Sequence, residues 1–271
     1  MVILKMVIVM TILITGALSG LGYQYAKELA KRGHIVYAGV ENEQQLQVLN
    51  QKILEEKIIL FPIVLQLLDK TTWPDFSLLD IDVLILQAGI GESGSILEID
   101  QNRWQKTYET NVFGNVGIIQ QFLRILRKNN KQGKLFITSS LAAFLPFPYL
   151  SSYTSTKIAL YAIAKTLVWE TKLQKIPVAI SVIMPGAYAT GFNDVMIENK
   201  AKDLLLLPTL ASKVTFGQKI WFALTEQHQT TKLCQKVVRA TERKYVPFVI
   251  SAPLSQSLTV KLYRLYDSLL H

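Results

Sequence analysis

The chain has 271 residues, of which 50% are hydrophobic and 18% charged, with 14 Gly and 9 Pro. This composition supplies enough apolar side chains for a large core, and it excludes a disordered chain, a collagen-like repeat and a string of small modules. The single cysteine, Cys234, excludes an intramolecular disulfide, and the three histidines are too scattered for metal-ligand spacing. We therefore expect a cytoplasmic protein without a bound metal.

The charge is basic, with 29 Lys+Arg against 20 Asp+Glu and a formal net charge of +9. Much of the excess lies in residues 201–271, which carry ten basic and four acidic side chains. Nucleic-acid binding is not expected, because no run of five or more basic residues occurs and basic solvated surfaces are common.

The chain begins with an almost wholly apolar segment, MVILKMVIVMTILI. It is too short for a membrane-spanning helix, which needs about 20 apolar residues, and no small-residue cleavage site follows it. The continuous run of β-branched and leucine side chains predicts a buried parallel strand over residues 7–15. A membrane-dipping N-terminus is the alternative.

Apolar runs and amphipathic stretches then alternate along the chain. The runs predict strands at 7–15, 34–40, 58–65, 82–86, 134–138 and 178–184. The amphipathic stretches predict helices at 20–32, 42–56, 103–128 and 155–175. This alternation indicates an α/β fold with a doubly wound parallel sheet covered by helices on both faces. Because no repeat or linker interrupts residues 1–271, we expect a single domain.

Two segments depart from the alternation. Between Asp69 and Asp82 the connection is too short for a full crossover helix, so either a single helical turn or a loop is expected. Residues 187–231 are irregular and apolar, which is typical both of a mobile lid over an apolar pocket and of a helical hairpin packed on the core.

A glycine-rich turn, TGALSGLG, joins the first strand to the first helix at residues 15–22. Glycines at such a turn let the backbone approach a pyrophosphate, and the helix N-terminus offers free N–H groups and the positive end of its dipole. Alone, this pattern is equally typical of a tight structural loop.

Three Tyr-x-x-x-Lys pairs occur, in which one helical turn places a phenol and an ammonium on the same face. They begin at Tyr23, Tyr153 and Tyr161. A nearby ammonium favours phenolate and brings a tyrosine toward a working pKa as a general acid or base. At least two of the three are expected to be surface or packing pairs.

Ser140 singles out the pair Tyr153/Lys157. It lies 13 residues before Tyr153, at the end of the strand-like KLFITSS, whereas the same spacing from the other tyrosines gives Pro148 and Met10. Ligands bind at the carboxyl ends of parallel strands, so a catalytic hydroxyl is expected there. The alternative is a serine that only caps local backbone.

With these residues in order, the sequence resembles the short-chain dehydrogenase/reductase family, which has a Rossmann-type fold, over nearly its whole length. The matching motifs are the turn at residues 15–22, Ala88-Gly89, Asn111 in NVFG, Ser140, SYTSTK with Tyr153 and Lys157, and PGAYAT at residues 185–190. The VYAGV and PGAYATGF segments are most similar to the branch that acts on steroids, retinoids and other lipophilic alcohols and ketones.

The resemblance implies a catalytic group made of Asn111, Ser140, Tyr153 and Lys157. Tyr153 would exchange a proton with the substrate oxygen and Ser140 would orient that oxygen. Lys157 would depress the pKa of Tyr153 and hold the nicotinamide ribose, while Asn111 would hold a relay water. These roles agree with carbonyl reduction, which leaves charge on oxygen for a positioned acid to quench.

The resemblance also implies the residues that hold a nicotinamide cofactor. They are Gly16, Ser19, Gly20, Leu21 and Gly22 at the pyrophosphate, Ala88 and Gly89 at the adenosine, Asp69 at the adenine, Tyr153 and Lys157 at the ribose, and Pro185, Gly186 and Thr190 at the nicotinamide. The chain departs from the family at Leu86 and Gln87, which replace two asparagines.

Glu41 follows the second strand, where a carboxylate accepts from a ribose 2′-hydroxyl and repels a 2′-phosphate, so NAD is favoured over NADP. The alternative is that Glu41 points to solvent and decides nothing.

The C-terminal stretch at residues 254–270 places Leu258, Leu262, Leu265 and Leu269 at helical spacing. We expect a helix whose stripe packs on the chain's own core or on a second subunit, with contact to an anionic membrane surface as the alternative. The resemblance implies a homodimer or homotetramer built on the 103–128 and 155–175 helices.

The expected function is hydride transfer between the cofactor and a lipophilic alcohol or ketone. The alternative is a catalytically retired protein that keeps the fold and serves as a nucleotide-binding sensor or interaction partner. The altered residues Leu86 and Gln87 favour the alternative, and the complete Asn, Ser, Tyr and Lys set argues against it.

Overall fold

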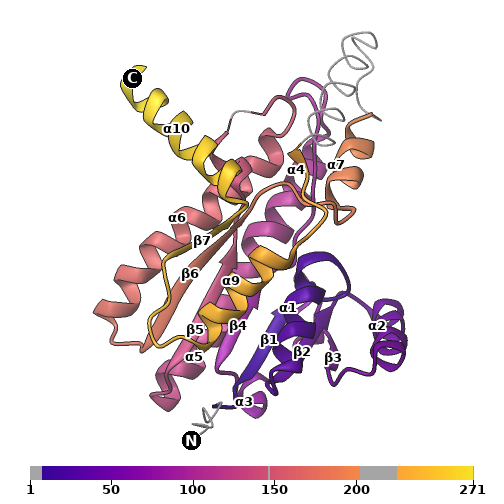
Figure 1. Cartoon of the computed structure of the whole chain (residues 1–271), viewed down its shortest axis with the longest axis vertical. Coiled ribbons are helices and arrows are strands. Elements are labelled where there is room, and N and C mark those ends of the chain that lie inside the picture. Colours follow the sequence, from indigo (N-terminus) through magenta and orange to yellow (C-terminus); the bar gives the residue numbers. More distant parts are fainter. Residues whose placement is uncertain (1–7, 146, 202–224, 271) are drawn as a thin grey trace, which may run out of the picture.

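The computed structural model describes residues 8–145, 147–201 and 225–270. Seven parallel strands form one sheet in the order β3-β2-β1-β4-β5-β6-β7 (Figure 1). The strands are β1 (Thr11–Thr15), β2 (Ile35–Val40), β3 (Phe61–Val64), β4 (Val83–Leu86), β5 (Gly133–Thr138), β6 (Val178–Pro185) and β7 (Val249–Ala252). The strand order reverses direction between β1 and β4, which confirms the predicted doubly wound sheet.

Helices cover both faces of the sheet. They are α1 (Gly20–Lys31), α2 (Glu43–Glu56), α3 (Phe76–Leu79), α4 (Gln101–Tyr108), α5 (Asn115–Asn129), α6 (Ser151–Leu173), α7 (Phe192–Ala201), α9 (Thr231–Glu242) and α10 (Leu254–Leu270). Side chains of α1, α2 and α9 share a buried cluster with one face, and those of α5 and α6 share a cluster with the other. Strands buried on both faces explain the continuous apolar runs in the sequence.

The first strand is shorter than predicted. β1 begins at Thr11, where the pairing with Ile35 of β2 begins, and Val83 of β4 pairs with the next residue, Ile12. Ile8 and Val9 therefore have no neighbouring strand and are exposed, and residues 1–7 lie outside the described chain. No helix within the described ranges is both long and apolar enough to cross a membrane.

The predicted helix at 103–128 consists of three segments. A π-helical turn over Glu109–Gly114 separates α4 from α5, and it contains the buried Asn111. The short connection after Asp69 contains a 3-10 turn, Lys70–Thr72, and the single-turn helix α3, as one of the two sequence alternatives predicted.

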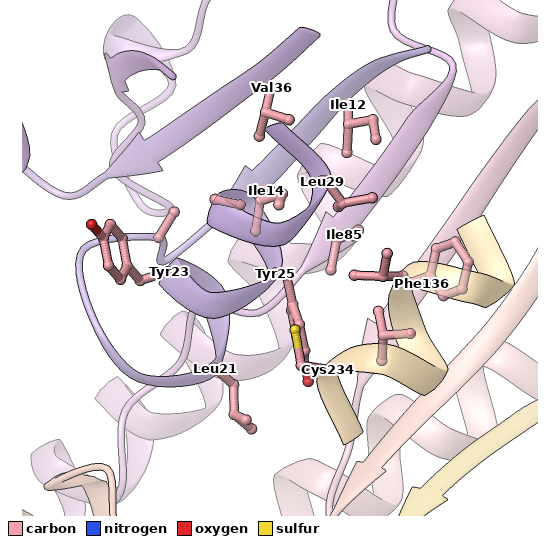
Figure 2. Packing of buried hydrophobic residues seen from close by; sticks show 14 of the residues in the cluster. Ile12, Ile14, Leu21, Tyr23, Tyr25, Leu29, Val36, Ile85, Phe136 and Cys234 are labelled. Atoms are coloured by element: carbon pink, nitrogen blue, oxygen red, sulfur yellow. The ribbon is translucent and has the colours of Figure 1, made fainter. Parts of the chain in front are cut away.

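The C-terminal part contributes elements that periodicity did not predict. Strand β7 extends the sheet beside β6, and α9 packs against α1. Tyr25 of α1 and Cys234 of α9 lie together in this contact, beside Ile14 and Ile85 of the sheet (Figure 2). The chain after residue 224 therefore completes the core that the first strand begins.

The helix at residues 254–270 forms as predicted, but three of its four predicted leucines do not pack on the described core, and the Leu269 side chain lies outside the described residues. Ser257 and Val260 of α10 are buried, whereas Leu258, Leu262 and Leu265 are exposed. The physical reason is that Val260 occupies the core contact, and the leucines lie on the opposite side of the helix.

Candidate active site

A cavity of about 1080 Å³ opens at the carboxyl ends of the strands. Ligand pockets are commonly about 300–1,000 Å³, so this cavity has room for a cofactor together with a substrate. Most of the predicted site residues line it: Gly16, Ser19, Gly20, Leu21, Gly22, Glu41, Ala88, Gly89, Ser140, Tyr153, Lys157, Pro185, Gly186 and Thr190. Asn111 is fully buried behind the wall, and Asp69 does not line the cavity.

The glycine-rich turn brings three backbone segments close together. Gly16 has a φ of +66°, and a Cβ there would lie 2.7 Å from the Ala88 Cα atom, while one at Gly22 would lie 2.3 Å from the Gly16 carbonyl oxygen. Ser19 is the N-cap of α1, but its side chain makes no capping hydrogen bond. The first N–H groups of α1 are therefore left without a side-chain cap beside the cavity, which suits an anionic group.

The two replaced asparagines do not leave the end of β4 unsupported. The Thr138 hydroxyl donates to Gln87 Oε1 at 2.9 Å, which links the ends of β4 and β5. The backbone N–H groups of Gln87 and Ala88 both donate to the Thr15 hydroxyl at 3.1 Å. Gln87 thus makes a side-chain hydrogen bond across the strands.

At the far end of the cavity, the structure places Glu41 on the wall and Asp69 away from it. Gln45 Nε2 donates to a Glu41 carboxylate oxygen at 3.3 Å. The Asp69 carboxylate instead accepts from the Thr71 N–H at 2.9 Å and caps the 3-10 turn, because the truncated crossover begins there. Gln66, which sequence analysis did not single out, lines the cavity at this place.

The buried pair Tyr153 and Lys157 lies on α6, facing the end of β5. Lys157 Nζ lies 5.5 Å from the centre of the Tyr153 ring and donates to the Thr138 carbonyl at 3.2 Å. Ser140 hydrogen-bonds to Tyr153, and its hydroxyl also accepts from the Ala142 N–H at 3.1 Å. Ser140 therefore caps local backbone and also contacts the tyrosine, and its catalytic role stays a prediction.

The expected depression of the Tyr153 pKa is wrong for this structure. Burial raises the pKa of Tyr153 to about 12, and the Ser140 hydrogen bond offsets only part of that rise. Burial also lowers the pKa of Lys157 to about 8. Both shifts have one cause, since a buried site disfavours the charged form of either group.

Asn111 lies in the π-helical turn and holds the loop that follows β4. Its side chain accepts from the Ile90 N–H at 2.7 Å and donates to the Ile90 carbonyl at 2.9 Å. A further bond runs to the Thr156 hydroxyl on α6 at 3.2 Å. Asn111 therefore joins the β4 loop to the helix that carries Tyr153.

The other two Tyr-x-x-x-Lys pairs have structural surroundings, as expected. The Tyr23 hydroxyl donates to Glu56 at 2.8 Å, and Lys27 pairs with the same carboxylate. Tyr161 packs edge-on against Phe144 with ring centres 5.0 Å apart.

The wall beside Tyr153 is mostly apolar. The Phe192 ring of α7 lies 5.7 Å from the Tyr153 ring, between centres, and Met196 of the same helix packs with both. Leu145, Phe147 and Leu150 also line this part. Helix α7, which belongs to the irregular segment at 187–231, thus covers the cavity. Residues 202–224 of that segment lie outside the described chain.

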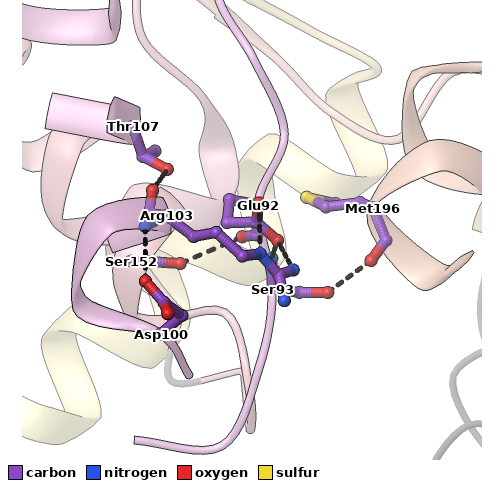
Figure 3. A network of polar contacts seen from close by, with 7 residues as sticks. All are labelled: Glu92, Ser93, Asp100, Arg103, Thr107, Ser152 and Met196. Carbon is purple, nitrogen blue, oxygen red and sulfur yellow. Dashed lines mark hydrogen bonds and ion pairs between the residues drawn. The ribbon is translucent and has the colours of Figure 1, made fainter. Parts of the chain in front are cut away.

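A polar network closes the same wall (Figure 3). The Glu92 carboxylate pairs with the Arg103 guanidinium, whose Nε lies 3.2 Å away, and Glu92 is 7% exposed. The Ser152 hydroxyl donates to the Glu92 carbonyl at 3.1 Å, and the Ser93 hydroxyl donates to the Met196 carbonyl. The loop after β4 is therefore tied to α4, to α6 beside Tyr153, and to α7.

Sequence reasoning missed Glu92 and Gln256, which both line the cavity. A signal existed for Glu92, since it is the only carboxylate in the glycine-rich stretch GIGESG after β4. No local sequence signal pointed to Gln256, because its partner is distant: its Oε1 accepts from the Ala187 N–H at 2.8 Å across 69 residues of sequence.

Comparisons with known proteins agree with this geometry. The family model "short chain dehydrogenase" matches residues 10–201. An uncharacterized oxidoreductase, YvaG of Bacillus subtilis, is 24% identical over 92% of this chain and 91% of its own. The 3-ketodihydrosphingosine reductase of Bacteroides thetaiotaomicron is 29% identical over 68% of this chain and 65% of its own.

Solved structures show the same fold. A short-chain dehydrogenase/reductase from Burkholderia phymatum, in complex with NAD, has a TM-score of 0.79 at 20% identity and covers 98% of this chain and 96% of its own. One from Streptomyces avermitilis has a TM-score of 0.74 at 19% identity, with 97% and 96% coverage. The chain belongs to the short-chain dehydrogenase/reductase family of oxidoreductases.

Proposed function

We propose that this oxidoreductase transfers hydride between NAD(H) and a lipophilic alcohol or ketone. The observation that carries the proposal is a single cavity that contains both the uncapped N-terminus of α1 and the buried pair Tyr153 and Lys157. One end suits a phosphate-bearing cofactor and the other suits proton exchange with a carbonyl oxygen.

The residues present fit a nicotinamide dinucleotide. The close approach of Gly16, Gly22 and Ala88 leaves bare backbone at the turn, and the first N–H groups of α1 would hold the pyrophosphate. Pro185, Gly186 and Thr190 would flank the nicotinamide, and Ala88 and Gly89 the adenosine. The cofactor, when bound, supplies or accepts the hydride.

The chain's own residues hold and move the proton. Tyr153 keeps its phenolic proton at neutral pH and can donate it to a ketone oxygen. Ser140 orients that oxygen, the Lys157 ammonium stabilises the phenolate left behind, and Asn111 keeps the β4 loop and α6 in register.

Glu41 supports NAD as the preferred cofactor. Its carboxylate lies on the cavity wall beside Gln45, where it can accept from a ribose 2′-hydroxyl. Ser19 supplies no positive charge for a 2′-phosphate at the turn.

The apolar wall supports a lipophilic substrate. Phe192, Met196, Phe147, Leu145 and Leu150 surround the approach to Tyr153. The Bacteroides relative is named as a reductase of a 3-keto compound, 3-ketodihydrosphingosine, which agrees with a ketone substrate.

The assembly proposed for the chain is a homodimer or homotetramer. Exposed apolar side chains on the 103–128 and 155–175 segments support it, namely Phe113, Ile158 and Trp169.

The test is a fluorescence titration of the purified protein with NADH and with NADPH, followed by turnover assays on a series of ketones of increasing chain length. We expect tighter binding of NADH and a kcat/KM that rises with chain length. Binding of neither nucleotide by the folded protein would overturn the proposal and favour the retired-enzyme alternative. A preference for short polar ketones would overturn the substrate class.

A further inference from the structure

Helix α10 has an inner face that closes the active-site cavity. Gln256, Thr259 and Val260 line the cavity, and Val260 is 4% exposed within the core. Gln256 also fixes the helix, because its Nε2 donates to the Thr225 carbonyl at 2.7 Å while its Oε1 accepts from the Ala187 N–H.

The outer face of α10 carries leucines. Leu254, Leu258, Leu262 and Leu265 are 54–77% exposed. At about 100° per residue they fall within an arc of about 80°, on the side opposite Val260. An apolar stripe that faces away from the described core marks an interaction surface, since single exposed leucines are common but aligned ones are not.

The helix also projects from the body of the molecule (Figure 1). From Lys261 to Ser268 every side chain except the half-buried Tyr263 is exposed within the described chain. A short helical segment is marginally stable in water without a partner for its apolar side. The distal part of α10 therefore gains from a surface that covers the leucines.

The charged residues of α10 indicate which kind of surface covers the leucines. Lys261 lies at the edge of the leucine stripe, and Asp267 is the one acidic residue of the helix. Arg264 lies on another side of the helix, where its guanidinium is 4.6 Å from the centre of the Phe144 ring. The chain as a whole carries +9. A second copy of α10 would bring a further Lys261 ammonium to the same stripe, whereas an anionic surface complements this charge.

We propose that α10 docks the protein on the surface of an anionic lipid bilayer, with the leucine stripe in the boundary between headgroups and acyl chains. Because the inner face of the same helix lines the cavity, docking brings the cavity wall next to the lipid. Delivery of a lipophilic substrate from the bilayer would rest on the function proposed above, but the docking itself does not.

The test is co-sedimentation of the full chain with phosphatidylcholine vesicles, with and without phosphatidylserine. The stripe variant combines Leu258→Ser, Leu262→Ser and Leu265→Ser. Its matched control combines Leu54→Ser, Leu78→Ser and Leu97→Ser, which are 77–85% exposed elsewhere on the molecule. A second variant, Lys261→Glu, keeps the leucines and reverses the charge at their edge.

We expect the unaltered chain to bind the anionic vesicles and the stripe variant to bind them at least about tenfold more weakly, because each leucine loses its apolar contact. The control should bind as the unaltered chain does, and Lys261→Glu and added salt should both weaken binding. Thermal melts and NADH titration of each variant show that fold and cofactor site are intact, so failure of docking is distinguishable from failure of the proposed activity.

Two results would overturn the proposal. One is sedimentation of the stripe variant equal to that of the unaltered chain. The other is absence of vesicle binding by the unaltered chain, and a stripe variant whose mass by light scattering is then halved would assign the leucines to a second copy.

Discussion

Tyr153 and Lys157 are buried side by side, and burial moves the pKa values of the two groups apart. The phenol has a pKa of about 12 and the ammonium one of about 8. At neutral pH both groups carry their protons, which is the state that ketone reduction needs, since the phenol must donate and the charge it leaves must be stabilised.

The Tyr153→Phe variant tests the proton donor. We expect kcat to fall at least about 100-fold, because the positioned acid is lost, while the NADH dissociation constant changes by less than about threefold. Steady-state kinetics and fluorescence titration measure the two quantities. Tyr161→Phe belongs to a similar Tyr-x-x-x-Lys pair and should keep full activity, whereas full activity of Tyr153→Phe would exclude Tyr153 as the acid.

The pKa of Lys157 predicts how ketone reduction depends on pH. The rate should fall as the pH rises through about 8, where Lys157 loses its charge while Tyr153 still holds its proton. Lys157 binds its proton more weakly when folded, so its contribution to the free energy of unfolding rises with pH between about 8 and its usual value of 10.5. Initial rates from about pH 6 to about pH 10 check this, and a rate that stays constant across that range would contradict it.

The Glu41→Arg variant tests cofactor choice. Removing the carboxylate and adding a guanidinium should shift the NADH-to-NADPH affinity ratio toward NADPH by about tenfold or more, since Arg binds phosphate well. Parallel titrations measure the ratio. Glu43→Arg makes the same charge change at another acidic residue nearby, at the start of α2, and should leave the ratio nearly unchanged.

At the scale of elements, the loop after β4 connects the helices that form the walls of the cavity. The segment after β4 is bonded to α4 through Glu92 and Arg103, to α6 through Ser152, and to α7 through Ser93. α7 carries Phe192 and Met196 over Tyr153. Because the buried Glu92 carboxylate holds this loop to α4, we expect the position of the apolar wall to depend on it.

The Glu92→Gln variant tests this arrangement. Loss of the charged hydrogen bond to Arg103 should lower the free energy of unfolding by about 1–3 kcal/mol and raise KM for a lipophilic ketone more than it lowers kcat. Chemical denaturation and steady-state kinetics measure these effects. Glu109→Gln alters a carboxylate that accepts from an exposed Gln105 side chain, and it should be nearly neutral. Equal kinetics for the two variants would show that Glu92 has no role in positioning the wall.

At the scale of the whole molecule, the end of the chain completes the core begun at its start. Leu233 and Val237 of α9 are fully buried with Ile12 and Ile14 of β1 and with Tyr25 and Leu29 of α1. Strand β7 pairs with β6, and the family match ends at residue 201, before α9 and β7. The matched residues 10–201 and the C-terminal elements α9 and β7 should therefore unfold together.

The Leu233→Ala variant tests this coupling. A cavity at the contact between α9 and α1 should lower the free energy of unfolding by about 2–5 kcal/mol, and the chain should still unfold in a single transition. Leu54→Ala, at a leucine that is 77% exposed, is the control and should change stability by less than about 0.5 kcal/mol. Two separate transitions would show that the chain does not unfold as a single domain.

The sequence alone determined the doubly wound sheet, six of its seven strands and the residues of the glycine-rich turn and of the Ser140, Tyr153 and Lys157 group, which line the cavity. These features are local: continuous apolar runs, a glycine turn at a strand end, and a Tyr-x-x-x-Lys pair that follows a strand-end serine at a fixed distance. Each is encoded within a few residues, and the carboxyl ends of parallel strands bring them together.

The tertiary structure alone decided which further residues line the cavity, which side chain of α10 joins the core and which pKa values are shifted. These features depend on contacts between distant segments. Asp69 became a cap because the shortened crossover begins beside it, and Gln66 lies at the cavity instead. Gln256 reaches Ala187 across the sheet edge, and Val260 takes the core contact that the leucine pattern suggested for the stripe. The pKa values of Tyr153 and Lys157 were also decided there, since burial depends on the whole assembly of elements around α6.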